Sequence, residues 1–197
     1  MSQLIHFKLP AIFLFSSFSN TNYRWYWFAV FFSSMSMGIN LITQGWLVLE
    51  MTNDPLWVGL LAGVAGISQV TFGFISGVIV DRWNKRIIIL VVQLCTGFIG
   101  LTVALLLFFN NLELWHLTIT AIFNGVLISL RIPTGNSIVF SIVGSKSILN
   151  ALASQLIAFN ISRMVGSVLA GTAISELGVP YAYLLVMVTS WIGAGIF

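Results

Sequence analysis

The segment from Gly77 to Arg86 combines residue types that could join two helix ends reversibly. It reads GVIVDRWNKR, so Gly77 lies one helical turn before Asp81, and Arg82, Lys85 and Arg86 follow closely. Glycine permits close approach of a second helix, and an acid can neutralise the positive end of a helix dipole. The basic side chains could pair with acids that come near in only one conformational state. The segment therefore predicts a conformational gate, although a short basic loop between two helices is the alternative.

Arg163 is the second residue that could do chemistry, because it lies about midway along a long apolar segment. A charge within a membrane-spanning helix is costly, so we expect Arg163 to face the bundle interior or a water-filled cavity. Asn160 precedes it by three residues and shares its helix face. Arg163 could anchor an anionic substrate or a gating carboxylate. A structural arginine that donates to helix carbonyls is the alternative.

Amide side chains recur along the apolar segments. Asn40 and Gln44 are spaced i and i+4, which places both on one helix face. As a set, the amides could line a polar cavity, whose first candidates are Asn40, Gln44, Asn160 and Arg163. Interhelical hydrogen bonds, worth about 0.6 kcal/mol on average, are the alternative role for each amide. The further amides are Gln69, Gln93, Asn124 and Gln155.

No arrangement of residues typical of an enzyme occurs in the sequence. His6 and His116 have no acid and nucleophile at a defined spacing, and there is no Gly-rich phosphate loop. His, Cys and acidic residues do not cluster as metal ligands would. The few basic residues form no nucleic-acid footprint. We therefore expect no enzymatic activity, cofactor, metal or nucleic-acid partner.

All of these residues belong to a strongly apolar chain. Hydrophobic residues make up 58% of the 197 residues and charged residues only 7%, whereas a soluble domain carries about 25% charged residues. A membrane-spanning helix needs roughly 20 apolar residues. The sequence therefore predicts an all-α integral membrane protein with a bilayer as its surroundings. Its helices are expected at about 25–49, 57–80, 87–109, 115–134, 150–175 and 180–197.

The two ends and the fourth connection need separate interpretation. Residues 1–24 are interpreted as a lead-in, and residues 25–197 as one six-helix bundle, because the connections are short. Residues 138–143 are apolar and could extend the fourth helix or lie at the membrane interface. The sixth segment is still apolar at Phe197, which predicts that the sequence is cut short within this helix.

Charge sorts the connections into two classes. The first, third and fifth connections contain Glu50, Asp54, Glu113 and Glu176 and no Lys or Arg. The positive-inside rule makes the opposite side cytoplasmic, so we expect a multi-pass protein of the plasma (inner) membrane with its N-terminus in the cytoplasm. Seven of the eight basic residues mark that side, namely Lys8, Arg24, Arg82, Lys85, Arg86, Arg131 and Lys146.

The Gly77–Arg86 segment resembles the signature loop of the major facilitator superfamily, G-x-x-x-D-R-x-G-R-R, with Asn84 in place of the usual glycine. Other stretches resemble its drug- and siderophore-exporting branch, related to the enterobactin exporter. They are Asn22–Arg24, Gly45–Val48, Met51–Gly59, Arg131–Pro133, Asn150–Ala151 and Asn160–Gly171. Ser167 stands where antiporter members usually have proline. The resemblance covers residues 20–197 and implies the six-helix N-terminal half of a twelve-helix transporter fold.

The resemblance implies a secondary active transporter that exports a small drug- or siderophore-like molecule by alternating access. Its expected partners are that substrate, the bilayer and a C-terminal six-helix half of the same protein. A non-transporting six-helix scaffold or an isolated half-transporter is the alternative, and an ATP-driven pump is a third. Small residues are expected to pack the helices, since they permit close approach. They are Gly59, Gly63, Gly73, Gly166 and Gly171.

Overall fold

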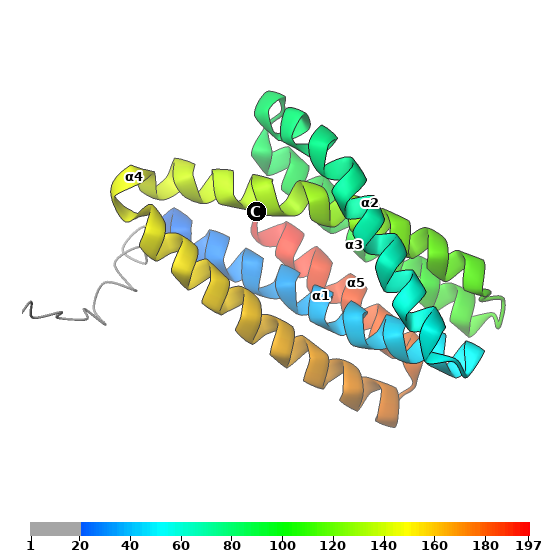
Figure 1. The fold of residues 1–197 in the computed structure, drawn as a ribbon. Coiled ribbons are helices and arrows are strands. Elements are labelled where there is room, and N and C mark those ends of the chain that lie inside the picture. The colour runs from blue at the N-terminus through cyan, green and yellow to red at the C-terminus, as the bar shows by residue number, and fades with distance from the viewer. Residues whose placement is uncertain (1–20) are drawn as a thin grey trace, which may run out of the picture.

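A computed structural model describes residues 21–197, apart from the side chains of residues 145–147, and these residues form helices joined by short turns. The order is α1 (Thr21–Thr52), α2 (Pro55–Arg82), α3 (Lys85–Phe108), α4 (Leu114–Glu176) and α5 (Val179–Ile196). α4 turns back at Gly144, as Figure 1 shows, and has two long parts. We call Leu114–Gly144 the first limb and Ile148–Glu176 the second limb. The described residues thus hold six helices long and apolar enough to span a membrane, which confirms the all-α prediction.

Residues in the short connections cap the helix ends. Asp54 caps α2 by accepting a hydrogen bond from the Leu56 amide at 2.9 Å, and Pro55 follows at the first helical position. Asn84 caps α3 in the same way, accepting from the Arg86 amide at 3.0 Å. The asparagine that replaces glycine in the signature loop therefore starts a helix. The turn in α4 needs glycine, because Gly144 has a φ of 67° and a ψ of −178°.

Two expected boundaries differ from the structure. The fourth helix does not end near residue 134 but runs to Gly144, so residues 138–143 extend it. The reason is burial of apolar surface. Val139 packs in a cluster with Tyr23, Tyr26 and Ala151, so continuing the fourth helix past residue 134 removes these side chains from their surroundings. At the other end, residues 21–24 belong to α1 rather than to a lead-in. Residues 1–20 lie outside the described part of the chain.

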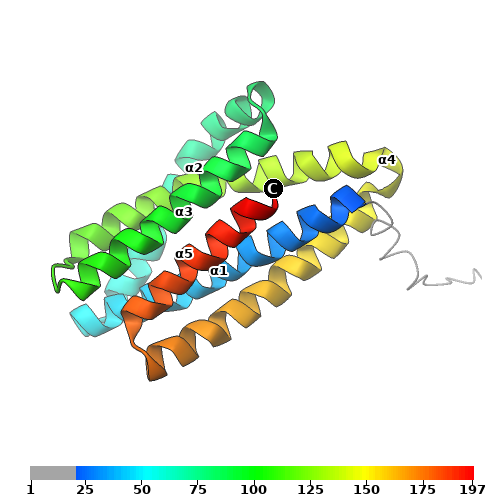
Figure 2. The same cartoon turned by 180° about the vertical axis from the view of Figure 1, so that it is seen from behind.

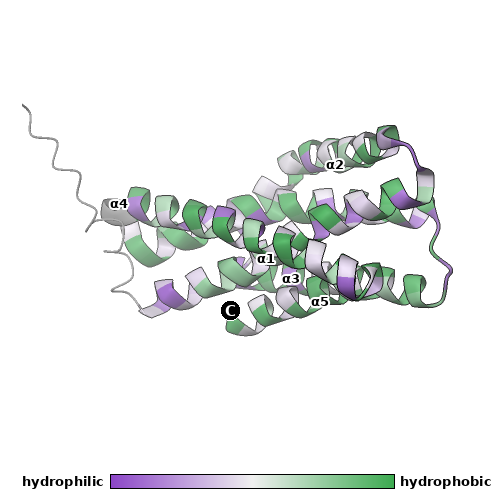
Figure 3. Cartoon of the chain, turned by 90° about the horizontal axis from the view of Figure 1, so that it is seen from below, coloured by the Kyte–Doolittle hydropathy of each residue, from purple (hydrophilic) through white to green (hydrophobic). Residues whose placement is uncertain are grey.

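The helices pack around α1. α1 contacts α4 and α5, α3 contacts α5, and α2 packs on α4. Figure 2 shows α3, α5 and α1 running side by side. Figure 3 shows hydrophobic residues along the helices and many of the hydrophilic ones near the connections, as expected for a bundle surrounded by lipid.

Glycines allow two of these helix crossings. At the crossing of α1 with the second limb, a Cβ added to Gly38 would lie 2.9 Å from Arg163 Cα and overlap the Arg163 carbonyl oxygen. One added to Gly166 would overlap the Met35 carbonyl oxygen. At the crossing of α2 with the first limb, one added to Gly125 would lie 2.8 Å from Ser68 Cβ. Only glycine lets these backbones come so close.

The other expected packing glycines do not pack within the described residues. A Cβ added to Gly59, Gly63, Gly73 or Gly171 would meet nothing within 4 Å. On α2 the reason is the helix face, because Gly59 and Gly63 lie on the side away from the buried residues and Gly73 lies at the edge of the buried side. That buried side consists of Leu61, Ser68, Ser76 and Val80.

Aromatic side chains near the start of α1 join it to both limbs of α4. Tyr26 Oη donates to the Gly135 carbonyl of the first limb at 3.1 Å. Tyr23 Oη donates to the Ala151 carbonyl of the second limb at 2.8 Å and pairs with the Ser154 hydroxyl. Trp27 Nε1 donates to the Ser154 carbonyl at 3.3 Å. These bonds hold α1 at the end of the bundle where α4 turns back.

Replacing Tyr23 by phenylalanine is expected to lower the free energy of unfolding by about 1 kcal/mol, because two buried hydrogen bonds are lost while the ring remains. Denaturant titration of the purified protein in detergent measures the difference. Tyr181→Phe is the matched control, since Tyr181 is 44% exposed and its contact with Phe108 is between rings. Equal stability of the two variants would show that the Tyr23 hydroxyl does not stabilise this junction.

Candidate functional site

A cavity of about 180 Å³, partly open to the surface, lies between α1, α2, α3 and both limbs of α4. Its walls are mostly apolar and include Val48, Leu61, Val92, Leu127 and Ile128. A smaller set of polar side chains interrupts this lining. They are Asn40 and Gln44 from α1, Thr96 from α3, Asn124 and Arg131 from the first limb and Arg163 from the second.

α1 supplies the amides that the sequence placed on one helix face. Both Asn40 and Gln44 line the cavity, and Asn40 Nδ2 donates to Gln44 Oε1 at 3.5 Å. Both side chains are half-buried. This contact is long, so both amides keep most of their capacity for further hydrogen bonds.

Arg163 also lines the cavity, from the second limb of α4, whereas these amides belong to α1. The Gly38 crossing brings the Arg163 backbone against α1. Its guanidinium carbon lies 5.3 Å from the centre of the Phe159 ring, a cation–π contact on the same helix. This contact offsets part of the cost of a charge in the bundle and leaves the guanidinium donors available to a ligand.

Asn160 is not part of the cavity. Its side chain is exposed, and Nδ2 donates to the Leu156 carbonyl of its own helix at 2.8 Å. Asn160 is one helical turn from Arg163, as the spacing predicts. The rotation of the second limb, however, leaves the Asn160 side chain exposed and away from the cavity. The expectation that Asn160 is a cavity residue is therefore wrong for the described residues.

Arg131 is the charged cavity residue that the sequence did not predict, and Thr96 is a further polar one. We expected it beside a cytoplasmic connection, but the first limb continues for thirteen residues beyond it to Gly144, which places Arg131 well inside the helix. It lines the cavity, and its Nη2 is buried with no hydrogen-bond partner among the described residues. The signal that could have found it is the apolar run at 138–143, which extends the helix.

Of the remaining amide side chains, one lines the cavity and three do not. Asn124 lines the cavity, and its Nδ2 is buried without a hydrogen-bond partner among the described residues. Gln69, Gln93 and Gln155 are not among the lining residues. Gln93 is only 1% exposed and its Nε2 lies close to Gly193 of α5. The amides thus do not line the cavity as a set.

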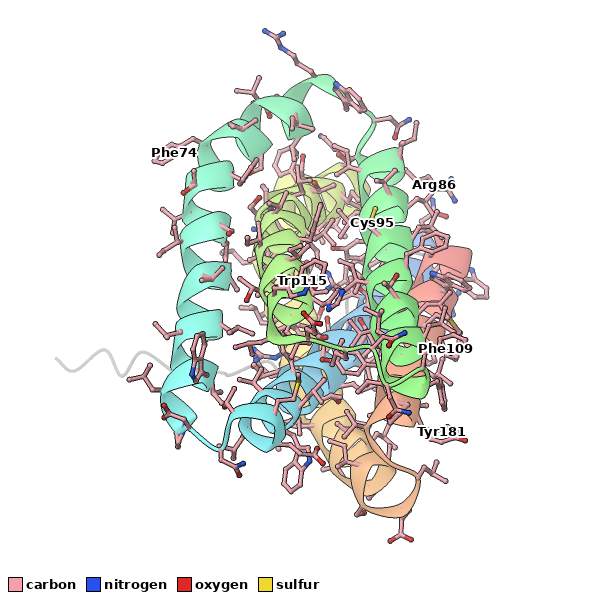
Figure 4. All side chains as sticks on the ribbon, turned by 90° about the vertical axis from the view of Figure 1, so that its right-hand side faces the viewer. Phe74, Arg86, Cys95, Phe109, Trp115 and Tyr181 are labelled. Atoms are coloured by element: carbon pink, nitrogen blue, oxygen red, sulfur yellow. The ribbon has the colours of Figure 1, made fainter. Side chains whose placement is uncertain are left out.

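The expected gate lies apart from the cavity. Asp81 and Arg82 end α2, and Lys85 and Arg86 begin α3. None of these residues or Gly77 lines the cavity, and Asp81 forms no hydrogen bond or ion pair with another described residue. Arg86 Nε donates to the Phe197 carbonyl. Figure 4 shows Arg86 at the start of α3 and Phe74 pointing away from the bundle on α2.

Membrane-length helices around a partly polar cavity, with arginines inside and acids only at helix ends, are typical of a membrane transporter. The chain belongs to the transmembrane secretion effector family of the major facilitator superfamily, whose model matches residues 13–193. It is 25% identical to the enterobactin exporter EntS of Salmonella typhi and of Salmonella paratyphi A over 163 residues. The Citrobacter koseri exporter of that name is 24% identical over the same length. In each case the match covers 82% of this chain and 39% of the relative, so the chain spans less than half the length of these curated relatives.

Proposed function

We propose that this chain forms the N-terminal half of a secondary transporter that exports a small, drug- or siderophore-like organic molecule by alternating access. The observation that carries the proposal is the partly polar cavity inside the bundle of a chain from a secretion family. A ligand site of this kind is mostly apolar and has a few well-placed polar groups. The described residues show no group of His, Cys, Asp or Glu that could hold a metal ion.

A second six-helix half is the proposed partner inside the membrane. The outward face of α2 supports this, because Ile67 is 70% and Phe74 83% exposed and the glycines of that face have no close neighbour. Met164 and Val168 of the second limb are exposed as well. Small residues on an outward face let another helix approach closely. We therefore place the second half against α2 and the second limb.

We propose that the end with the α2–α3 turn faces the cytoplasm. Arg24, Arg82, Lys85 and Arg86 lie at this end of the described bundle, whereas Glu50, Asp54, Glu113 and Glu176 lie at the other. The positive-inside rule supports the assignment, although Arg131 no longer contributes to it. The α2–α3 turn would then close the cytoplasmic side when the cavity opens outward.

Export by cells tests the proposal. The complete gene is expressed in a bacterial strain that lacks its own exporters of siderophores and cationic drugs, and compounds of both kinds are followed in cells and medium. We expect faster release of at least one compound from cells that produce the protein. We expect Arg163→Ala to abolish this release at an unchanged level of protein in the membrane, because the variant removes a cavity charge. Release that is no faster than from empty-vector cells for every compound would favour the scaffold alternative.

A further inference from the structure

We infer that Arg131 and Arg163 together select an anionic ligand with an apolar body, and that Arg131 is a specificity-determining residue. The inference rests on the proposed function, since it names the class of substrate that the cavity would take. Three observations carry it. The two arginines lie at a similar depth in the bundle, no acidic residue lines the cavity, and two hydrogen-bond donors at the cavity have no partner among the described residues.

The two arginines lie at a similar depth. Arg131 precedes Gly144, the end of the first limb, by thirteen residues, and Arg163 follows Ile148, the start of the second limb, by fifteen. At a rise of 1.5 Å per residue, both therefore lie about 20 Å from the turn that joins the limbs. Both also line the same cavity, and we therefore expect one ligand to contact both guanidinium groups.

The cavity contains no acid to balance these charges. Its lining residues include no Asp or Glu. All five acids of the sequence lie at helix ends: Glu50, Asp54, Asp81, Glu113 and Glu176. Two like charges in surroundings of low polarity repel each other, and each favours an opposite charge nearby. The described chain thus has two cavity cations whose counter-ion must come from elsewhere.

The cavity also has more hydrogen-bond donors than acceptors. Arg131 Nη2 and Asn124 Nδ2 are both buried and have no hydrogen-bond partner among the described residues. A guanidinium can donate but cannot accept. A buried donor without a partner is costly, especially when it carries charge. A ligand with carboxylate or phenolate oxygens would satisfy both donors and balance the charge, whereas a cationic group offers the donors no acceptor and is repelled by the arginines.

The rest of the lining requires an apolar body on the ligand. Most of the wall consists of aliphatic residues such as Leu41, Val58 and Leu61. The volume of about 180 Å³ is similar to that of an apolar cavity of about 150 Å³ that holds benzene. An aromatic ring system that carries an anionic group fits both the size and the polarity of this space.

The test compares two probes of nearly the same size and shape, the anionic naphthalene-2-carboxylate and the neutral naphthalene-2-carboxamide. Protein from the complete gene is purified in detergent, and the Kd of each probe is measured at pH 7 by equilibrium dialysis. We expect the carboxylate to bind about tenfold or more tightly than the amide, since a charge-assisted hydrogen bond is the difference. Arg131→Gln and Arg163→Gln should each reduce this ratio several-fold, because each variant keeps one of the two guanidinium groups, and Arg131→Lys should reduce it less. Arg24→Gln is the matched control, because Arg24 is exposed and donates to Thr21 Oγ1 at the start of α1, away from the cavity.

Two results would overturn the inference. Equal affinity of the wild-type protein for both probes would show that the cavity does not select anions. A ratio that is unchanged in Arg131→Gln would show that Arg131 serves another purpose, such as an ion pair with a carboxylate elsewhere in the protein. If Arg131→Gln does not fold, the ratios for Arg131→Lys and Arg163→Gln decide in its place.

Binding and export together separate the anion site from the transporter function. Export of a neutral or cationic compound without preference for the carboxylate would overturn the inference and leave the transporter. Selective binding of the carboxylate without export of any compound would leave the anion site and overturn the transporter.

Discussion

Replacing Gly38 by valine is expected to prevent the protein from accumulating in a folded form. Any Cβ at this position would overlap the Arg163 carbonyl oxygen and lie 2.9 Å from Arg163 Cα, and these are backbone atoms that cannot turn aside. α1 and the second limb would have to separate along their crossing, which would also displace Met35 from Gly166. We expect a loss of about 3 kcal/mol or more in the free energy of unfolding. Gly38→Ala should produce a milder form of the same defect.

The measurement is the amount of monodisperse protein in detergent and its midpoint of thermal unfolding. Gly195→Ala is the matched control, because a Cβ there meets nothing within 4 Å and α5 is not placed against the proposed second half. We expect this control to keep the wild-type amount and midpoint. A Gly38→Val protein with wild-type thermal stability would mean that α1 and the second limb do not cross closely at these residues.

Replacing Asp81 by asparagine is expected to reduce export by about tenfold or more while the protein stays in the membrane. Asp81 is exposed in the last turn of α2 and has no hydrogen bond or ion pair with another described residue, so its removal leaves the described bundle intact. In the proposed transporter we expect this carboxylate to face a helix N-terminus of the second half in one state only. Losing such a state-specific contact shifts a conformational equilibrium by about 1–3 kcal/mol.

Export per membrane-inserted protein, quantified on the same cells, measures this effect. Glu176→Gln is the matched control, since Glu176 is also an exposed carboxylate in the last turn of a long helix, at the opposite end of the bundle. This control should export at the wild-type rate. Wild-type export by Asp81→Asn would remove the α2–α3 turn from the mechanism.

Membrane-length helices and the separation of charge could be read from the sequence, because both depend on composition along the chain. A lipid-facing helix needs about 20 apolar residues wherever it packs, so six segments were recognisable without knowledge of their neighbours. The same holds for Arg163 and for the Asn40–Gln44 pair. A charge within an apolar helix must find a polar space, and an i, i+4 pair shares one face in any helix.

The depth of Arg131, the outward position of Asn160 and the choice of packing glycines could not be read in this way. Each depends on how a helix is rotated against its neighbours or on where it ends, and both follow from contacts between distant segments. Val139, packed against Tyr23, extends the first limb and so places Arg131 inside the bundle. The rotation of α2 turns Gly59 and Gly63 outward, while Gly38 meets Arg163. The sequence by itself thus determined a bundle of membrane-length helices with most of its charges at the ends and Arg163 within a helix. Only the tertiary structure decided that two arginines share one cavity, because rotation and helix length are set by packing rather than by local sequence.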